Sequence, residues 1–140
     1  MVLGGVLVDH PDGLAGHSDG DVLSHAVVDA VLGAAGLGDI GTHFPSSDER
    51  WRDAPGRIFL ERAAAMTAGS GFLIANVDVT VICEEPRLDA YREKMQSSIA
   101  GSLGIGTDRV SVKATTTDGM GFTGRGEGIA AIAVAALDRA

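Results

Sequence analysis

The sequence contains little cysteine, few aromatic residues and fewer basic than acidic side chains, and each shortage excludes a class of protein. The single Cys83 cannot form a disulfide within the chain, which predicts a reducing, cytoplasmic location. With 11 Lys and Arg against 19 Asp and Glu, the formal net charge of −8 argues against partners that are nucleic acids or anionic membranes. The apolar start MVLGGVLV lacks the basic region and the length of a signal peptide or a spanning segment, so we expect neither.

The remaining composition predicts one domain over residues 1–140. The chain is 45% hydrophobic, enough for a sizeable core, but aromatic residues make up only 4% and glycine contributes 20 residues. The core must therefore consist largely of Ala, Val, Leu and Ile, joined by many tight turns. The sequence shows no internal repeat and no low-complexity linker.

Apolar periodicity predicts alternating strands and helices. Strands are expected over 2–8, 72–83 and 110–114, and helices over 20–35, 58–68, 88–104 and 129–137. The segment 39–53 shows no apolar periodicity, which predicts a mobile loop. This order predicts an α/β (α+β) sandwich with one mixed sheet and helices on one face. Because the strands carry apolar side chains on both sides, we expect the other face to pack against further copies of the chain.

The stretch HSDGDVLSH contains a polar stripe on an otherwise apolar helix. Asp21, His25 and Asp29 are spaced i, i+4 and i+8 and share one helix face, with Asp19 as the expected N-cap. His25 is a candidate metal ligand with Asp21 or Asp29 as its hydrogen-bonding support. The alternative is a solvated polar face or a histidine satisfied within the core.

Two residues precede this helix at its expected N-terminus. There, free backbone N–H groups favour a phosphate or carboxylate, and the imidazole of His17 could assist Ser18 in binding one. The alternative, in which Ser18 and Asp19 only cap the helix, leaves His17 unexplained.

A third cluster, ATTTDGMGFTGRGEG, covers residues 114–128. It contains a literal G-x-G-x-x-G at Gly119, Gly121 and Gly124, but no further strand with an acidic residue follows, so we reject a dinucleotide site. Three threonine hydroxyls, Arg125 and several backbone amides suit the oxygens of a phosphate ester. The alternative is that the threonines only form a strand.

The chain resembles the 2-C-methyl-D-erythritol 2,4-cyclodiphosphate synthase family of the non-mevalonate isoprenoid pathway. Four motifs in the family's order and spacing carry the resemblance: HSDGDVLSH at 17–25, LGDIGTHFP at 37–45, NVDVTVI at 76–82 and KATTTDGMGFTGRGEG at 113–128. The resemblance implies a homotrimer with active sites between subunits and, at the trimer axis, a cavity that can hold a prenyl diphosphate.

The implied substrate is 4-diphosphocytidyl-2-C-methyl-D-erythritol 2-phosphate. Its 2-phosphate attacks the β-phosphorus, the bond to CMP breaks, and CMP leaves as the cyclic diphosphate forms, so the enzyme is a phosphorus–oxygen lyase. The resemblance also implies Zn²⁺ or a similar divalent cation, and Mg²⁺ or Mn²⁺ bound with the substrate diphosphate.

The family's functional positions map onto this chain residue by residue. The resemblance implies that His25 ligates zinc and that His17 and Thr116 stabilise the phosphates during catalysis. At the trimer axis it implies Phe122, Arg125 and Glu127. For the substrate it implies Ser18, Asp39, Ile40, Gly41, Phe44, Pro45, Ser46, Ser47, Asp48, Pro86, Arg87, Leu88, Ala114, Thr115, Thr117 and Asp118.

Three positions depart from the family pattern. Ser46 stands where an acidic residue is common, and Asp118 stands where a Glu helps to hold Mg²⁺ or Mn²⁺; Asp118 is one methylene shorter and can still coordinate. The family's two other zinc ligands, an Asp-x-His in its first strand, lie upstream of the residues that match Gly4-Gly5, and Asp9-His10 does not replace them.

Three interpretations follow from the third departure. A natural N-terminal segment with the first strand precedes these residues, or the chain is a catalytically impaired trimer that binds cytidine or prenyl diphosphates. Alternatively, the chain is a metal-dependent phosphohydrolase that uses His17, His25 and a water.

Overall fold

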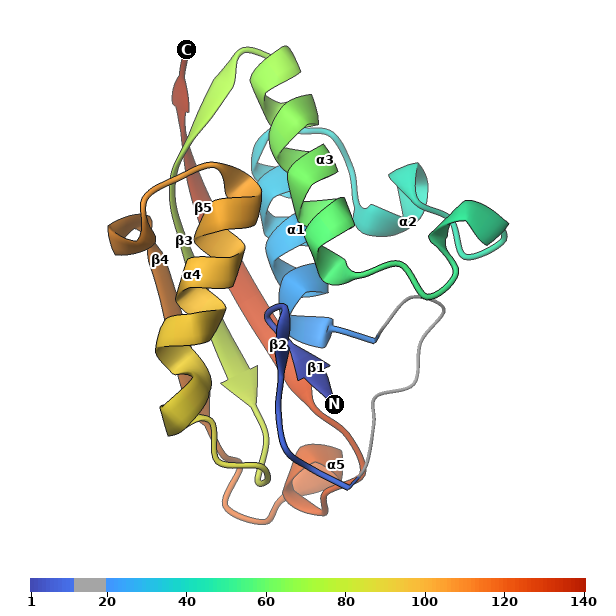
Figure 1. Ribbon diagram of the computed structural model, residues 1–140, viewed down its shortest axis with the longest axis vertical. Helices are drawn as coiled ribbons and strands as arrows, with labels where there is room; N and C mark the ends of the chain where they lie inside the picture. The colour runs from blue at the N-terminus through green and yellow to red at the C-terminus, as the bar shows by residue number, and fades with distance from the viewer. Residues whose placement is uncertain (12–19) are drawn as a thin grey trace.

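The computed structural model describes residues 1–11 and 20–140 and contains a three-stranded mixed sheet (Figure 1). The strand order is β4–β3–β5. The central strand β3 (Phe72–Ile82) runs parallel to β4 (Val110–Thr115) and antiparallel to β5 (Ala130–Arg139). The predicted fold class, a mixed sheet with helices, is confirmed.

Three long helices cover one face of the sheet: α1 (Val22–Ala34), α3 (Gly56–Gly69) and α4 (Arg92–Leu103). Helix α1 packs on β5 and β3, α4 packs on β4, and α3 packs against both α1 and α4. The remaining helical turns are short: α2 (Ile40–His43), α5 (Gly121–Gly124), η1 (Glu49–Trp51), η2 (Asp89–Tyr91) and η3 (Thr107–Arg109).

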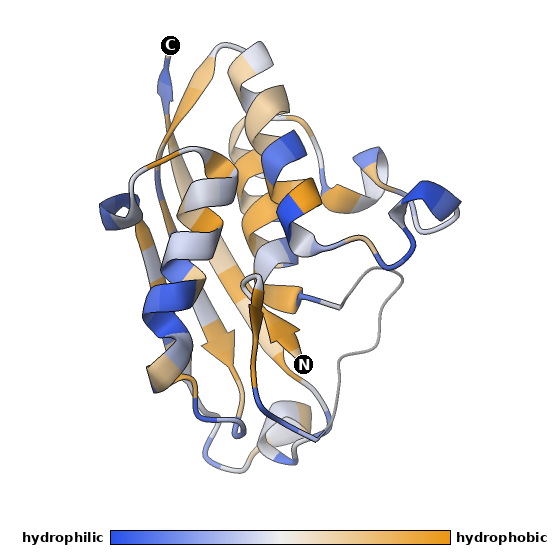
Figure 2. Cartoon of the chain, in the orientation of Figure 1, coloured by the Kyte–Doolittle hydropathy of each residue, from blue (hydrophilic) through white to orange (hydrophobic). Residues whose placement is uncertain are grey.

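Alternation along the strands separates a buried face from an open one. Val77, Val79 and Val81 of β3 are at most 1% exposed, and their register partners on β4 and β5 face the same way. Each buried valine contributes roughly 1.5–3 kcal/mol relative to an exposed one. Figure 2 shows hydrophobic colour along α1 and the strands beneath the helices, and hydrophilic colour on much of α4.

The opposite face of the sheet combines ionic and apolar side chains. Asp78 of β3 accepts a hydrogen bond from the ammonium group of Lys113 on β4 at 2.8 Å, while Ile132 and Val134 of β5 are 64% and 66% exposed. Within this chain, a large apolar area on β5 therefore remains in contact with solvent.

The prediction of a helix over residues 129–137 is wrong, because this segment is strand β5. The run of alanines and branched residues has no polar face, so its periodicity did not separate a helix from a strand. In the strand, Ala131, Ala133 and Ala135 face the core, where their small side chains leave room for α1. Ile132 and Val134 point to the open face.

The expected strand over 2–8 is a two-stranded hairpin instead. β1 (Val2–Leu3) pairs with β2 (Val6–Leu7) through a turn at Gly4 and Gly5, which have φ values of 58° and 74°. A two-residue hairpin turn of this kind requires positive φ at both positions, which glycine adopts without a steric penalty.

The expected mobile loop over 39–53 is also corrected, since it contains α2 and η1. The other predicted helices and strands are found, with ends that differ by a few residues. Among the residues that the structure describes, no helix combines the length and apolar character needed to cross a membrane.

Candidate functional site

A pocket of about 230 Å³ opens where the parallel strands β3 and β4 end. This volume is below the range of about 300–1,000 Å³ that is usual for sites enclosing a drug-sized ligand, so the pocket suits one part of a larger molecule. Its lining comprises Cys83, Glu84, Pro86, Arg87, Leu88, Asp89, Arg92, Ala114, Thr115 and Thr116.

Six predicted substrate-binding or catalytic residues line this pocket together. Pro86, Arg87 and Leu88 come from the segment after β3, and Ala114, Thr115 and Thr116 come from the end of β4. The parallel register pairs Ile82 with Thr115, and the N–H of Cys83 donates to the carbonyl of Thr115 at 3.0 Å. Sheet pairing thus brings two segments about 30 residues apart to one place.

The sequence analysis missed four lining residues: Cys83, Glu84, Asp89 and Arg92. Cys83 is the last residue of the predicted strand 72–83, and Glu84 follows it shortly before the Pro-Arg-Leu segment. Their position beside these predicted substrate contacts is the signal that could have identified them. The Asp89 carboxylate forms an ion pair with the guanidinium group of Arg92, three residues later, with 2.9 Å between Oδ1 and Nη2. Such i, i+3 pairing is visible in the sequence once the helical turn is assumed.

Leu88 and Cys83 give the pocket an apolar floor, and Arg87 places an exposed positive charge at its rim, 4.0 Å from a carboxylate oxygen of Asp89. Leu88 and Cys83 are 3% and 5% exposed, whereas the Arg87 side chain is 93% exposed. Burial, together with the nearby charge of Glu84, raises the pKa of the Cys83 thiol above its ordinary value of 9.0. The thiol is therefore protonated at neutral pH and serves as an apolar wall rather than as a nucleophile.

The turn after β4 carries Thr116 and Asp118 beside the pocket. Asp118 has a φ of +53°, and its N–H donates to the hydroxyl of Thr116 at 3.2 Å. That hydroxyl also approaches an Asp118 carboxylate oxygen at 3.4 Å. Both residues are exposed, so a hydroxyl and a carboxylate stand side by side at the surface.

Thr117, a predicted substrate contact, points into the protein instead. Its hydroxyl donates to the carbonyl of Met120 at 2.6 Å and lies 3.0 Å from the hydroxyl of Thr123, which is buried. The Thr117 side chain therefore stabilises the turn that leads into α5.

The three residues predicted for the trimer axis lie together on and after α5. The guanidinium group of Arg125 binds the carboxylate of Glu127 through two hydrogen bonds of 3.0 and 3.2 Å. Phe122 is 53% exposed. Helix α5, which bears Phe122, lies at the end of the molecule toward which β3 runs (Figure 1).

The Asp21 carboxylate of the polar stripe has a structural role. It accepts hydrogen bonds from the backbone N–H groups of Gly4 and Gly5, each at 2.8 Å, and from the N–H and hydroxyl of Ser24 at 3.0 and 2.8 Å. Asp21 is fully buried and caps α1, a role that we expected of Asp19. The described contacts of its two oxygens therefore join the N-terminal hairpin to α1.

The other members of the stripe have separate surroundings. Asp29 accepts the N–H of Ile40 at 2.8 Å, and the half-buried ring of His25 meets the ring of Phe59 edge-on at 5.7 Å. Within residues 1–11 and 20–140, no three His, Cys, Asp or Glu side chains are grouped so that they could hold a metal ion. His17, Ser18 and Asp19 lie outside the described residues.

The predicted substrate segment 39–48 is anchored at both ends. Asp39 caps α2 by accepting the N–H and hydroxyl of Thr42 at 2.8 and 2.7 Å, and these hydrogen bonds lower its pKa below 3.8. Phe44 is buried, with its ring centroid 5.1 Å from those of both Trp51 and Phe59. Asp48 pairs with Arg50 at 2.7 Å.

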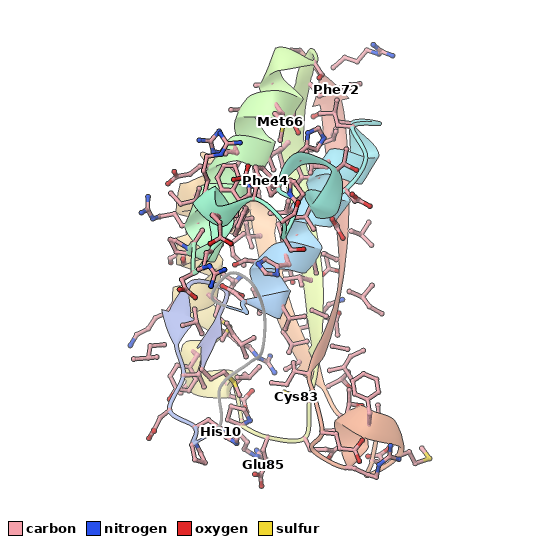
Figure 3. The ribbon with its side chains drawn as sticks, turned by 90° about the vertical axis from the view of Figure 1, so that its right-hand side faces the viewer. His10, Phe44, Met66, Phe72, Cys83 and Glu85 are labelled. Carbon is pink, nitrogen blue, oxygen red and sulfur yellow. The ribbon has the colours of Figure 1, made fainter. Side chains whose placement is uncertain are left out.

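Only part of this segment is open to a ligand. Pro45, Ser46 and Ser47 are exposed between the buried Phe44 and the paired Asp48, as is Gly41, while Ile40 is half-buried. Phe44 lies in the half of the molecule away from Cys83 and Glu85 (Figure 3). In one copy of the chain, the segment and the strand-end pocket are therefore apart.

A second and larger hollow, of about 560 Å³, lies at the other end of the sheet, beside Phe72, Leu73 and Ile105. Its polar side chains are those of Asp108 and Arg109. Among the residues described as lining it, none was predicted to act in a site. We therefore place the chemistry at the strand-end pocket, which is smaller.

Comparison with known proteins agrees with the arrangement of these motifs. Residues 1–138 match the model of the YgbB family. The chain is 57% identical over 140 residues to 2-C-methyl-D-erythritol 2,4-cyclodiphosphate synthase of Rubrobacter xylanophilus, covering all of this chain and 84% of that protein.

Solved structures show the same fold. The bifunctional IspDF of Campylobacter jejuni aligns with a TM-score of 0.96 and 41% identity over the whole chain, which spans 38% of that larger protein. A CDP-bound 2C-methyl-D-erythritol-2,4-cyclodiphosphate synthase aligns with a TM-score of 0.89 and 33% identity, over 99% of this chain and 89% of that one. The chain therefore belongs to the YgbB family, and the resemblance to 2-C-methyl-D-erythritol 2,4-cyclodiphosphate synthases that its motifs indicated is confirmed.

Proposed function

We propose that this chain converts 4-diphosphocytidyl-2-C-methyl-D-erythritol 2-phosphate into 2-C-methyl-D-erythritol 2,4-cyclodiphosphate and CMP. In this lyase reaction, an oxygen of the 2-phosphate forms a bond to the β-phosphorus. The bond between that phosphorus and the bridging oxygen breaks, and the electron pair leaves with CMP. No water enters the products.

One observation carries the proposal. The six residues that match the family's cytidine site line one pocket, and Thr116, the last of them, begins the turn that bears Asp118. The chain also belongs to a family with a CDP-bound relative. A base held against Leu88 and Ala114 would leave the attached diphosphate near the Thr116 hydroxyl.

The turn after β4 supplies groups suited to a diphosphate. The Thr116 hydroxyl can donate to a phosphate oxygen, and Arg87 can offer a guanidinium at the pocket rim. Mg²⁺ in proteins is commonly held by one or two carboxylates together with substrate phosphates. The exposed Asp118 carboxylate fits that requirement, and a cation held there would neutralise charge that develops on the diphosphate.

The described residues do not fit a zinc site. His25 is a suitable ligand type, but Asp21 is engaged by Gly4, Gly5 and Ser24, and Asp29 is engaged by Ile40. We therefore derive no step through zinc. The roles of His17 and Ser18 as phosphate and erythritol contacts stay predictions.

We also propose that the chain is a single domain that assembles as a homotrimer with active sites between subunits. Support comes from the exposed Ile132 and Val134 on the open sheet face, and from the separation of segment 39–48 from the pocket within one copy. Binding of a prenyl diphosphate beside Phe122 and Arg125, and a cytoplasmic location, stay predictions. Light scattering tests the trimer, for which we expect three times the 14.3 kDa of one chain.

The test of the function is product analysis with the cytidine diphosphate substrate and added Zn²⁺ and Mg²⁺. We expect CMP and the cyclic diphosphate in equal amounts. Release of inorganic or monoester phosphate would identify a phosphohydrolase instead, and binding of CMP without turnover would identify a catalytically impaired trimer. Either of these two results would overturn the proposal.

A further inference from the structure

Glu84 connects the two halves of the site. It lies just after β3, yet one of its carboxylate oxygens, Oε1, accepts the backbone N–H groups of Thr117 and Gly119 at 3.1 and 3.3 Å. We propose that Glu84 is a positioning residue: it holds the turn that presents Thr116 and Asp118 to the substrate. This role rests on the proposed function.

The two hydrogen bonds flank Asp118. Because Thr117 and Gly119 both donate to one oxygen, the Thr116–Thr117 and Asp118–Gly119 peptide groups point their N–H bonds toward Glu84, while the Asp118 side chain is exposed. Asp118 has a φ of +53°, a left-handed conformation that Asp adopts more often than most residues other than glycine, but still at a cost in free energy. The hydrogen bonds that Glu84 accepts from Thr117 and Gly119 help to offset that cost.

The other contacts of the turn hold its far end. Gly124 of α5 lies so close to Gly119 that an added Cβ would stand 2.3 Å from the carbonyl carbon of Gly119, and the Thr117 hydroxyl bonds to Met120. Thr116 and Asp118 also contact each other, at 3.2 and 3.4 Å. These contacts lie within the turn itself, so they do not tie the turn to the end of β3 as the Glu84 hydrogen bonds do.

Loss of the Glu84 contact should therefore affect turnover more than nucleotide binding. The pocket floor and wall come from Leu88, Ala114 and the strand pairing, none of which depends on the turn. Turnover requires Thr116 and Asp118 to meet the diphosphate in a fixed orientation, and a mobile turn would have to be ordered first.

Three variants and one control separate hydrogen bonding from charge. Glu84→Ala removes the acceptor, Glu84→Gln keeps an acceptor oxygen without the charge, and Glu84→Asp keeps the charge on a chain one methylene shorter. Glu85→Ala removes a carboxylate from the exposed neighbouring residue, which lies at the same end of the molecule (Figure 3). For each, we would measure kcat and KM for CMP release, the Kd of CMP, the melting temperature and the amide proton shifts of Thr117 and Gly119.

We expect Glu84→Ala to lower kcat at least about tenfold, with the Kd of CMP within about threefold of wild type. Glu84→Gln should keep at least about a third of wild-type kcat, and Glu85→Ala should stay within about twofold. The Thr117 and Gly119 amide protons should move upfield in Glu84→Ala and stay near their wild-type positions in Glu84→Gln. The shifts report the hydrogen bonds directly, which a general loss of stability would not.

Equal kcat in Glu84→Ala and wild type would overturn the proposal, as would a Glu84→Gln variant that loses as much as Glu84→Ala. If Glu84→Ala melts below the assay temperature, the pair Glu84→Asp and Glu84→Gln decides: a tenfold deficit of the Asp variant supports positioning, and equal rates contradict it. Failure of the proposed function is distinguishable, since the wild-type chain would then form no cyclic diphosphate, while the amide shifts would still test the turn.

Discussion

The strand-end pocket and the polar stripe of α1 are both rich in residues suited to phosphate or metal chemistry, but the fold uses them differently. At the pocket, pairing of β3 with β4 brings Pro86, Leu88, Ala114 and Thr116 to one opening. Along α1, Asp21 turns inward to Gly4 and Gly5, while Asp29 reaches Ile40. Sharing a helix face therefore does not make side chains act together.

The difference shows what assembles a site. Register in a sheet fixes which residues of two segments become neighbours, and here it places the segment after β3 beside the end of β4. A carboxylate on a helix has no such constraint, and it bonds to the nearest unpaired backbone N–H groups. For Asp21, those groups belong to its own helix N-terminus and to the Gly4-Gly5 turn.

The largest expected effect is that of a change on α1, at His25, which should alter turnover but not CMP binding at the strand-end pocket. Replacing His25 with Ala tests the role in turnover that the family resemblance implies for it: turnover should fall by about a hundredfold or more, while the Kd of CMP stays within about twofold. Chelation of divalent metals should likewise leave CMP affinity unchanged, because no metal is needed to form the pocket wall. Calorimetric titration with CMP measures both. A parallel fall in CMP affinity would mean that the regions are coupled.

Asp21 gives the next largest effect, on stability. Asp21→Ala leaves four donor groups without their acceptor, three of them in buried hydrogen bonds, so the free energy of unfolding should fall by about 3 kcal/mol. Asp29→Ala on the same helix loses one exposed hydrogen bond and should cost about 1 kcal/mol or less. Urea unfolding at one fixed protein concentration compares them. Equal costs would show that the buried network is not the stabilising contact.

Filling the pocket gives a smaller effect. Ala114→Leu places three further carbons where we expect the nucleotide, and CMP affinity should fall about tenfold or more while the melting temperature changes little. The matched control is Ala65→Leu on the exposed side of α3, for which CMP affinity should not change. Undiminished affinity in Ala114→Leu would place the nucleotide elsewhere.

The smallest effect concerns the cap of α2. Because Thr42 donates two hydrogen bonds to Asp39, the carboxylate form is favoured and the pKa of Asp39 lies below 3.8. The cap therefore stabilises α2 above pH 3.8, and this contribution disappears as the pH falls through the lowered pKa. Thr42→Val should raise the pKa of Asp39 back toward 3.8 in a carboxylate NMR titration. An unchanged pKa would assign the shift to another cause.

Much of the pocket could be predicted because residues 86–88 and 114–116 match the cytidine site of the family that the chain resembles, and because clear alternation located the two strands that lead to them. Val77, Val79 and Val81 indicated the β3 face; the motif at 86–88 comes shortly after β3, and the motif at 114–116 begins with the last two residues of β4. The strand β5 could not be predicted in the same way, since a run of alanines broken by Ile132 and Val134 has the polarity of a buried helix as well.

The remaining errors have a common physical origin. Asp21 looked like a metal-site residue because helical spacing ignores the backbone N–H groups of other segments, here those of Gly4 and Gly5. Residues 39–53 have no apolar periodicity, so they looked like a mobile loop. Their conformation is instead fixed by tertiary packing, because the rings of Phe44 and Trp51 contact Phe59 of α3. Contacts between distant segments leave no periodic signal in a sequence.

The most direct test of the account is a titration of the chain with CMP followed by amide chemical shifts. We expect the largest changes at Cys83, Glu84, Arg87, Leu88 and Thr115, at the ends of β3 and β4, with little change along α1. Changes centred on α1 around His25, or no changes at millimolar CMP, would contradict the assignment of the strand-end pocket as the nucleotide site.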